Sequence, residues 1–181
     1  MRAFSYSSQY GFSMIESMIA ALIIAIGLLG VAGMQIVAMK GTNHSVQQGK
    51  ASDLMQGLLE RMRSNSKGVY DENYNIVNSS TYKCNVALTK NCEDGVTLCN
   101  AKELAESDLY HTICGEGTSH TGGLIATLSN PSLSVSCIGG VGKCSSGINL
   151  KIKWQERLLG KEGSGNKTLP REISLDTVIA Q

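Results

Sequence analysis

The stretch Ser17–Met39, SMIAALIIAIGLLGVAGMQIVAM, decides the fold of this chain because none of its side chains carries a charge. At a rise of 1.5 Å per residue, these 23 residues form a helix of roughly 35 Å, long enough to cross a hydrocarbon core about 30 Å thick. The sequence therefore predicts one transmembrane helix near the N-terminus. Glu16 directly precedes this stretch, and a carboxylate costs roughly 2.5–3.5 kcal/mol at mid-bilayer and less near the interface. Such a residue predicts a functional partner for its charge.

The helical pattern continues past the apolar stretch. Apolar residues recur three or four positions apart, at Ala51, Leu54, Met55, Leu58, Leu59 and Met62. This spacing places them on one face of a helix, and in water such a face packs against other apolar groups. We therefore expect a single helix from about Phe12 to Ser64, roughly 80 Å long, whose second half packs on a soluble domain.

The remaining chain predicts a small sheet. Ile148–Trp154 is the clearest strand, because apolar residues alternate there with Asn and Lys. The other expected elements are a loop over 67–80, a short helix bounded by Cys99 and Cys114, strands over 123–128, 133–138 and 172–179, and a hairpin connection over 160–166. Three or four antiparallel strands packed against the long helix define an α+β fold of one small domain.

Six cysteines follow the apolar stretch: Cys84, Cys92, Cys99, Cys114, Cys137 and Cys144. An even number in a small domain favours disulfides in an oxidising compartment, so we expect this part of the chain to face the periplasm or the exterior. Metal binding is the alternative. However, no CxxC pair occurs, and His44, His111 and His120 have no ligand-like spacing from the thiols. We expect neither a metal site nor another cofactor.

The pairing of these cysteines is open, since six cysteines allow 15 connectivities. Cys137 and Cys144 are joined by IGGVGK, a flexible turn suited to a local bridge, and this pair is favoured. Cys99 and Cys114 flank the short helix expected between them. If that helix fills the interval, its ends lie roughly 20 Å apart, far beyond the Cα separation of about 5.5 Å in a disulfide. The pair Cys99–Cys114 is therefore disfavoured.

Residues 11–16, GFSMIE, followed by the apolar stretch, closely resemble the cleavage and methylation motif of type IV prepilins and pseudopilins. The resemblance implies that a membrane peptidase cuts after Gly11, that the new N-terminus, Phe12, is N-methylated, and that Glu16 acts in assembly. Cleavage leaves a cationic amine at Phe12, which in low dielectric pairs with Glu16 of a neighbouring subunit and sets the axial register. The alternative is that the Glu16 side chain only reaches the lipid headgroups.

Three further segments resemble PilV-type minor pilins: LERMRSN at 59–65, AESDL at 105–109 and IKW at 152–154. The resemblance implies a minor pilin that helps to prime type IV pilus assembly near the tip. It also implies the partners of such a protein: other minor pilins, the major pilin, the prepilin peptidase, the inner-membrane assembly platform and a tip adhesin. The expected location is the inner membrane, as a single-pass protein with a periplasmic C-terminal domain, and then the pilus at the cell surface.

This interpretation divides the chain into a leader over 1–11, a transmembrane assembly helix over 12–39, an amphipathic continuation over 40–65 and a disulfide-containing α+β domain over 66–181. Three other interpretations compete with it. A secretory signal peptide has a shorter apolar core than this chain. A minor pseudopilin of type II secretion shares the motif and the helix. A single-span anchored binding module predicts no cleavage at Gly11.

Several function classes find no support in the sequence. The formal net charge is +1, and no basic patch interleaved with aromatic residues indicates a nucleic-acid ligand. The segment GGVGKC at 139–144 lacks the leading glycine and the Ser or Thr of a phosphate loop. The three histidines have no obvious nucleophile partner. We therefore expect a structural protein and not an enzyme.

Overall fold

The computed structural model describes residues 13–86, 88, 90, 92–94, 96–116, 121–140, 142, 144–157 and 168–179. It divides into two compact units whose boundary falls between Thr42 and Asn43, and helix α1, Met14–Ser64, runs through both. The long helix expected from about Phe12 to Ser64 is therefore present over the described residues. The expected leader, Gly11 and Phe12 lie outside them.

The first unit contains the apolar part of α1. No residue between Ser17 and Met39 carries a charge, and the described side chains of this part are exposed. This half of α1 is long and apolar enough to cross a membrane, by length and composition. Because the apolar side chains find no cover within the unit, a low-dielectric surrounding suits them better than water.

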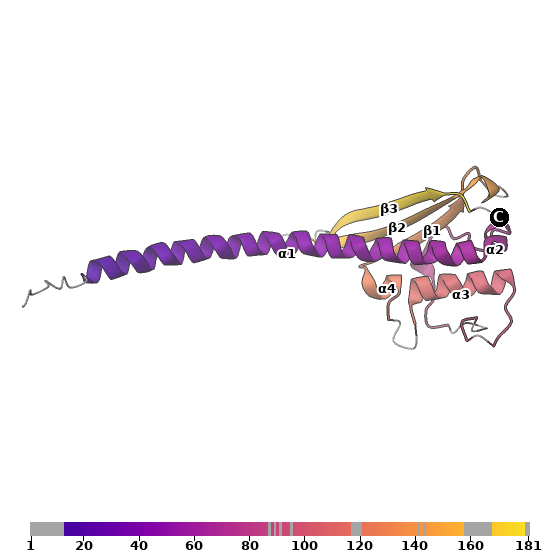
Figure 1. The fold of residues 1–181 in the computed structure, drawn as a ribbon, viewed down its shortest axis with the longest axis horizontal. Coiled ribbons are helices and arrows are strands. Elements are labelled where there is room, and N and C mark those ends of the chain that lie inside the picture. Colours follow the sequence, from indigo (N-terminus) through magenta and orange to yellow (C-terminus); the bar gives the residue numbers. More distant parts are fainter. Residues whose placement is uncertain are drawn as a thin grey trace, which may run out of the picture. The chain divides into compact units, whose positions relative to one another are not determined.

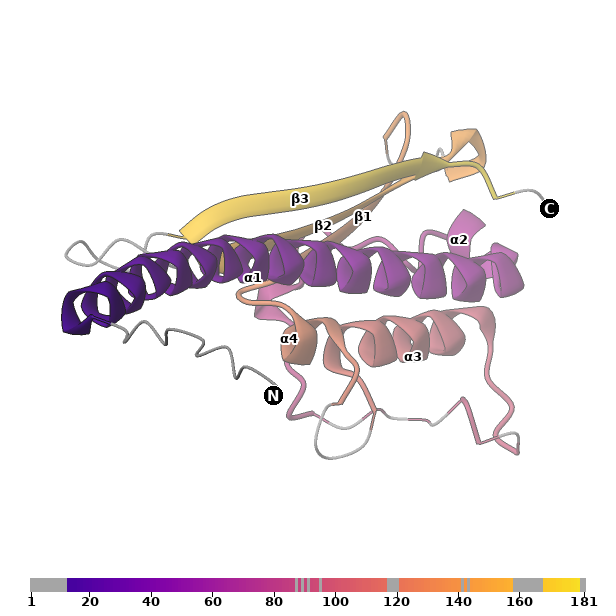
Figure 2. The same cartoon turned by 60° about the vertical axis from the view of Figure 1, so that its left-hand side comes forward.

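The second unit is built around a three-stranded antiparallel sheet of β1, β2 and β3 in that order. The strands span Ser132–Cys137, Ile148–Arg157 and Thr168–Thr177. Within this unit, α1 lies between the sheet and the helices α3, Ala101–Cys114, and α4, Leu124–Thr127 (Figures 1 and 2). The predicted α+β fold, with a long N-terminal helix packed on a small antiparallel sheet, is confirmed.

The apolar face of the sheet follows from the strand register. Leu150 of β2 pairs with Val135 of β1 and Leu175 of β3, and these side chains share one face. On the opposite face, Lys151 pairs with Ser134 and Ser174. The alternation predicted for Ile148–Trp154 is confirmed: its four apolar residues are all buried.

The second half of α1 supplies the other side of the core. The predicted apolar stripe is buried at Ala51, Met55, Leu58, Leu59 and Met62, and Leu54 packs against it. Burying one Leu or Met side chain contributes about 1.5–3 kcal/mol, so these contacts hold α1 to the sheet. Helix α3 adds Ala105, Leu109 and Ile113 from the other side.

Short elements complete the unit. They are the helix α2 over Ser66–Tyr70 and the 3-10 helices η1 over Ser79–Thr81 and η2 over Cys144–Ser146. Helix α3 begins with a capping box: the Asn100 side chain accepts hydrogen bonds from the backbone N–H of Lys102 and Glu103, and the Glu103 carboxylate accepts one from the Asn100 N–H.

Some expected boundaries were wrong. The strand predicted over 123–128 is instead the one-turn helix α4, because Gly123 lies against the backbone of Cys114 and Gly115, where no Cβ fits. This close approach turns the chain before a strand can extend. The strand predicted over 172–179 spans Thr168–Thr177 instead, whereas the helix predicted between Cys99 and Cys114 is confirmed as α3. The hairpin connection predicted over 160–166 lies outside the described residues.

Candidate assembly segment and buried polar network

Glu16 lies in the first turn of α1. Its backbone N–H donates to the Ser13 carbonyl at 3.0 Å, and the Ser17 hydroxyl donates to the Met14 carbonyl at 2.8 Å. A carboxylate in the first turn interacts favourably with the positive end of the helix dipole. The residues around it are apolar and exposed, with Ile15 at 66 % and Met18 at 72 %. No cation pairs with Glu16 among the described residues.

The two residues predicted to be processed, Gly11 and Phe12, lie outside the described residues, so their roles remain predictions. Glu16 is therefore the part of the predicted assembly site that the structure places. Its carboxylate lies on an exposed apolar helix. When such a helix is buried in a low-dielectric environment, the carboxylate requires a compensating positive charge.

The six cysteines form three disulfides. Cys137 pairs with Cys144 across the end of β1, with Cα atoms 4.5 Å apart, which is the pair that the spacing favours. Cys92 pairs with Cys99, with a Cα separation of 5.8 Å, and Cys84 pairs with Cys114 at 5.4 Å. The disfavoured pair Cys99–Cys114 is not formed. Helix α3 fills the interval between these two residues, which keeps them apart.

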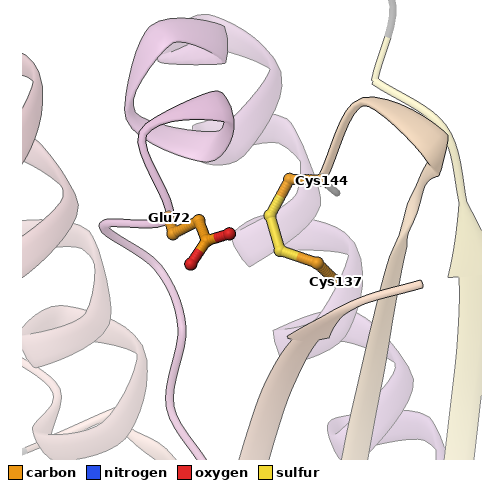
Figure 3. A group of neighbouring side chains, drawn as sticks. All are labelled: Glu72, Cys137 and Cys144. Carbon is orange, nitrogen blue, oxygen red and sulfur yellow. A yellow bond between two sulfur atoms is a disulfide. The ribbon is translucent and has the colours of Figure 1, made fainter. Parts of the chain in front are cut away.

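Glu72 lies beside the disulfide of Cys137 and Cys144 (Figure 3). The three side chains have the spacing of a metal site, but both sulfur atoms are already bonded to each other. A disulfide sulfur is not a thiolate ligand. The Glu72 carboxylate instead accepts a hydrogen bond from the backbone N–H of Gly142. This group therefore fits a constrained turn rather than a metal centre.

A buried polar network joins α1 to α3. The Arg61 Nη1 atom donates to Asp108 Oδ1 at 3.2 Å, and the Tyr74 hydroxyl donates to Asp108 Oδ2. Asn65 Nδ2 donates to the Tyr74 oxygen at 3.1 Å and to the Ala101 carbonyl at 2.8 Å. Burial and the hydrogen bond to Asp108 raise the pKa of Tyr74 well above its usual range. Every carboxylate oxygen of Asp108 thus has a donor, as a buried charge requires.

A second polar cluster joins α1, at the beginning of the second unit, to strands β2 and β3. The Trp154 indole N–H donates to Gln47 Oε1 at 3.1 Å. His44 Nδ1 lies 3.2 Å from Glu156 Oε2, which also accepts from Arg171 Nε at 2.7 Å. The hydrogen bond from Arg171 and the nearby charges lower the pKa of Glu156 below its ordinary value. Of the three histidines in the sequence, His44 takes part in this cluster, whereas His120 lies outside the described residues.

Sequence reasoning missed these two clusters. The residues of the first come from positions 61, 65, 74 and 108, and no local periodicity links them. The only signal was the resemblance of the segments 59–65 and 105–109 to one class of minor pilin, and the structure shows that these two segments meet through Arg61 and Asp108.

Two family models match the chain over adjoining ranges. Residues 6–32 match the prokaryotic N-terminal methylation motif, and residues 33–110 match the type IV pilin Tt1218 family. No curated protein and no solved structure matches the chain. Together with a long apolar N-terminal helix on a small antiparallel sheet, these matches define a pilin.

The chain belongs to the type IV pilins. Pilins are structural subunits, and nothing in the described residues points to catalysis. The methylation motif implies processing by a prepilin peptidase, and with the apolar helix it indicates a membrane-anchored pilin. Pilus-assembly components follow as its general class of partners.

Proposed function

We propose that this pilin is a minor pilin of a type IV pilus, cleaved after Gly11 and N-methylated at Phe12. The observation that carries the proposal is the placement of Glu16. Its carboxylate lies in the first turn of an exposed apolar helix and has no cationic partner among the described residues. A charge in this position needs a partner from outside the helix once the helix is buried.

The amine created at Phe12 is that partner in the proposal. It is cationic, and it belongs to a second subunit, because pairing between subunits also fixes their axial register. One unpaired charge in low dielectric carries a large penalty, so a subunit in the wrong register is rejected. A subunit at the extreme tip has no predecessor for this carboxylate. We therefore place this pilin beneath another minor pilin.

The proposed organisation keeps the four parts expected from the sequence: leader 1–11, assembly helix 12–39, amphipathic continuation 40–65 and α+β domain 66–181. The domain would lie in the periplasm before assembly and at the cell surface afterwards. Its three disulfides support this location, because disulfides persist in oxidising compartments.

The assignment as a PilV-type subunit that primes assembly near the tip has further support. Two of the segments that carry the resemblance meet through Arg61 and Asp108, and Trp154 of the third is 3 % exposed in the core. The segments that resemble PilV-type minor pilins thus contain residues that stabilise the second unit. The proposed partners are other minor pilins, the major pilin, the prepilin peptidase, the inner-membrane platform and a tip adhesin.

The test begins with the N-terminus of the protein isolated from its native membrane. Mass spectrometry is expected to find a methylated Phe12, and a protein that still begins at Met1 contradicts the proposal. Next, Glu16→Ala is expected to insert and to be cleaved normally but to enter purified pili at less than about one tenth of the wild-type level. Glu60→Ala removes an exposed acid from the same helix and is the matched control.

Normal incorporation of Glu16→Ala would show that the carboxylate has no assembly role. Detection of the wild-type protein in sheared pili separates a pilus subunit from a pseudopilin of type II secretion. A protein that is processed but absent from sheared pili favours the pseudopilin.

A further inference from the structure

The sequence contains the tripeptide pattern Asn-x-Ser/Thr at three places, which begin at Asn43, Asn78 and Asn166. In exported proteins this pattern is the acceptor of N-linked glycans, and acceptor asparagines lie in surface loops. The pattern is short and also occurs by chance, so the fold has to separate an acceptor from a coincidence. Asn166 lies outside the described residues, which leaves Asn43 and Asn78 to compare.

Asn43 has the wrong backbone for an acceptor. It lies inside helix α1, and so does Ser45, the third residue of its tripeptide. In an α-helix each backbone N–H donates to the carbonyl four residues earlier, so the Ser45 N–H does not reach the Asn43 side chain. An enzyme that takes up this tripeptide has to break the hydrogen bonds of the helix first.

Asn78 lies in a loop and has a different geometry. Its backbone is extended, with φ at −158° and ψ at 118°, and its Oδ1 atom accepts the Ser80 N–H at 2.9 Å. This arrangement is an Asx turn, in which the asparagine amide bonds to the backbone two residues later. Both residues are exposed, and Val77 before them is 94 % exposed. The two residues that the pattern specifies are therefore accessible in the folded domain.

The neighbours of this tripeptide are fixed to strand β1. Ile76 and Val135 exchange two backbone hydrogen bonds, of 3.0 and 2.8 Å. Ser79, the middle residue of the tripeptide, is 2 % exposed, and its Oγ atom accepts the Leu133 N–H at 2.6 Å. The fold thus buries the residue that the pattern leaves free and keeps the two specified residues at the surface.

The Asx turn also suits the Asn78 amide to glycosyl transfer. A side-chain amide nitrogen is a weak nucleophile, because its lone pair is delocalised into the carbonyl group. A hydrogen bond to Oδ1 stabilises the negative charge that develops on this oxygen when the nitrogen loses a proton. Among the described residues, the Nδ2 atom of Asn78 donates no hydrogen bond, so none has to be broken before transfer.

We propose that Asn78 is the acceptor of an N-linked glycan. The donor is a saccharide carried on a polyprenyl diphosphate, and the enzyme is an oligosaccharyltransferase on the outer face of the membrane. The Nδ2 atom forms a bond to C1 of the first sugar, and the C1–O bond to the diphosphate breaks. The diphosphate leaves with the electron pair of that bond, and the proton from Nδ2 passes to a carboxylate of the transferase.

This inference goes beyond pilus assembly. It requires that the second unit is exported, which its three disulfides support, but neither cleavage after Gly11 nor the pairing of Glu16.

The experiment uses the full-length protein isolated from its native cell and digested to peptides. Electron-transfer dissociation cleaves the backbone and keeps sugars attached, so it locates any added sugar mass. We expect sugar on Asn78 in most molecules and none on Asn43. Mild alkali distinguishes the linkages, because it removes sugar from serine and threonine but not from an asparagine amide. An unmodified Asn78, sugar on Asn43 in its place, or sugar that mild alkali removes overturns the proposal.

Four variants make the result specific. Asn78→Gln keeps an amide but lengthens the side chain, and it should abolish the modification. Ser80→Ala removes only the hydroxyl that the pattern requires and should lower the occupancy at least about tenfold, whereas Ser80→Thr should keep it within about twofold. Asn43→Gln is the matched control and should leave the occupancy of Asn78 unchanged. Melting curves of the four variants report their folding.

An occupancy of Asn78 that Ser80→Ala leaves unchanged overturns the acceptor assignment. The N-terminus is sequenced in the same samples. A protein that begins with methylated Phe12 but has no sugar on Asn78 contradicts this inference alone. A protein that begins at Met1 and carries the sugar contradicts the proposed function alone.

Discussion

Arg61 of α1 and Asp108 of α3 form an ion pair across 47 positions of sequence, with Nη1 and Oδ1 separated by 3.2 Å. Asp108 is only 3 % exposed, and its second oxygen accepts from the Tyr74 hydroxyl. A buried carboxylate with all of its oxygens satisfied holds its donors in fixed positions. This pair therefore sets how α3 lies on the second half of α1.

Replacing Asp108 with alanine should destabilise the protein by about 2–3 kcal/mol. The change leaves the Tyr74 hydroxyl without its acceptor and the Arg61 guanidinium with Glu93 as its remaining carboxylate partner, and breaking a fully buried pair would cost roughly 3–5 kcal/mol. The value is lower here because the Arg61 side chain is 36 % exposed. Denaturant unfolding of the full-length protein in detergent measures it. The control is Arg63→Ala, which removes an exposed pair with Glu60 and should cost less than about 1 kcal/mol.

Acid should weaken the protein through Glu156. The Arg171 hydrogen bond lowers the pKa of Glu156 in the folded state. The ionised Glu156 therefore stabilises the fold above its unfolded-state pKa of about 4.3, and this stabilisation is lost as the pH falls through its folded-state pKa. In Arg171→Ala the folded-state pKa of Glu156 rises, so the free energy of unfolding falls less steeply between about pH 5 and pH 3. Unfolding free energies measured across this range test the prediction. Lys153→Ala, which removes an exposed pair with Glu172, should keep the wild-type slope, and an equal change in both variants would contradict the assignment.

The disulfides should differ in their contribution. Cys84 and Cys114 are 30 positions apart, whereas Cys92 and Cys99 are 7 apart. Loop-closure entropy then predicts losses of about 3.6 and about 2.4 kcal/mol when each pair is changed to alanine. Thermal unfolding of the two double variants compares them, and mapping of non-reduced peptides by mass spectrometry checks the pairing. A larger loss for the shorter loop, or a Cys99–Cys114 peptide, would contradict this account.

Two glycines should respond in opposite directions to alanine. Gly123 lies against the backbone of Cys114 and Gly115, so Gly123→Ala forces the chain apart and should destabilise by about 1–3 kcal/mol. Gly49 has open space and helical geometry, so Gly49→Ala should stabilise by about 0.5–1 kcal/mol. Melting temperatures of both variants report the sign. A stabilised Gly123→Ala would mean that α4 does not pack against the end of α3.

The sequence was sufficient for the long helix, for the strand Ile148–Trp154 and for the α+β class. Each of these rests on local periodicity: an uncharged run of 23 residues, a stripe at spacing three and four, and an alternation of two. A functional hypothesis for Glu16 was also available, because a single acid at the start of an apolar helix is costly in a membrane, and its role in assembly remains a prediction. The pair Cys137–Cys144 could be favoured from its short glycine-rich interval, and the structure contains it.

Other features could not be predicted from local patterns in the sequence. The helix α4, the bridge between Cys84 and Cys114, and the network of Arg61 with Asp108 depend on residues brought together from distant positions. Periodicity predicts which face of an element is apolar, but tertiary packing determines which other element covers that face. Contacts between distant segments therefore follow from the folded arrangement, whereas the membrane-length helix and its acid follow from the order of the residues alone.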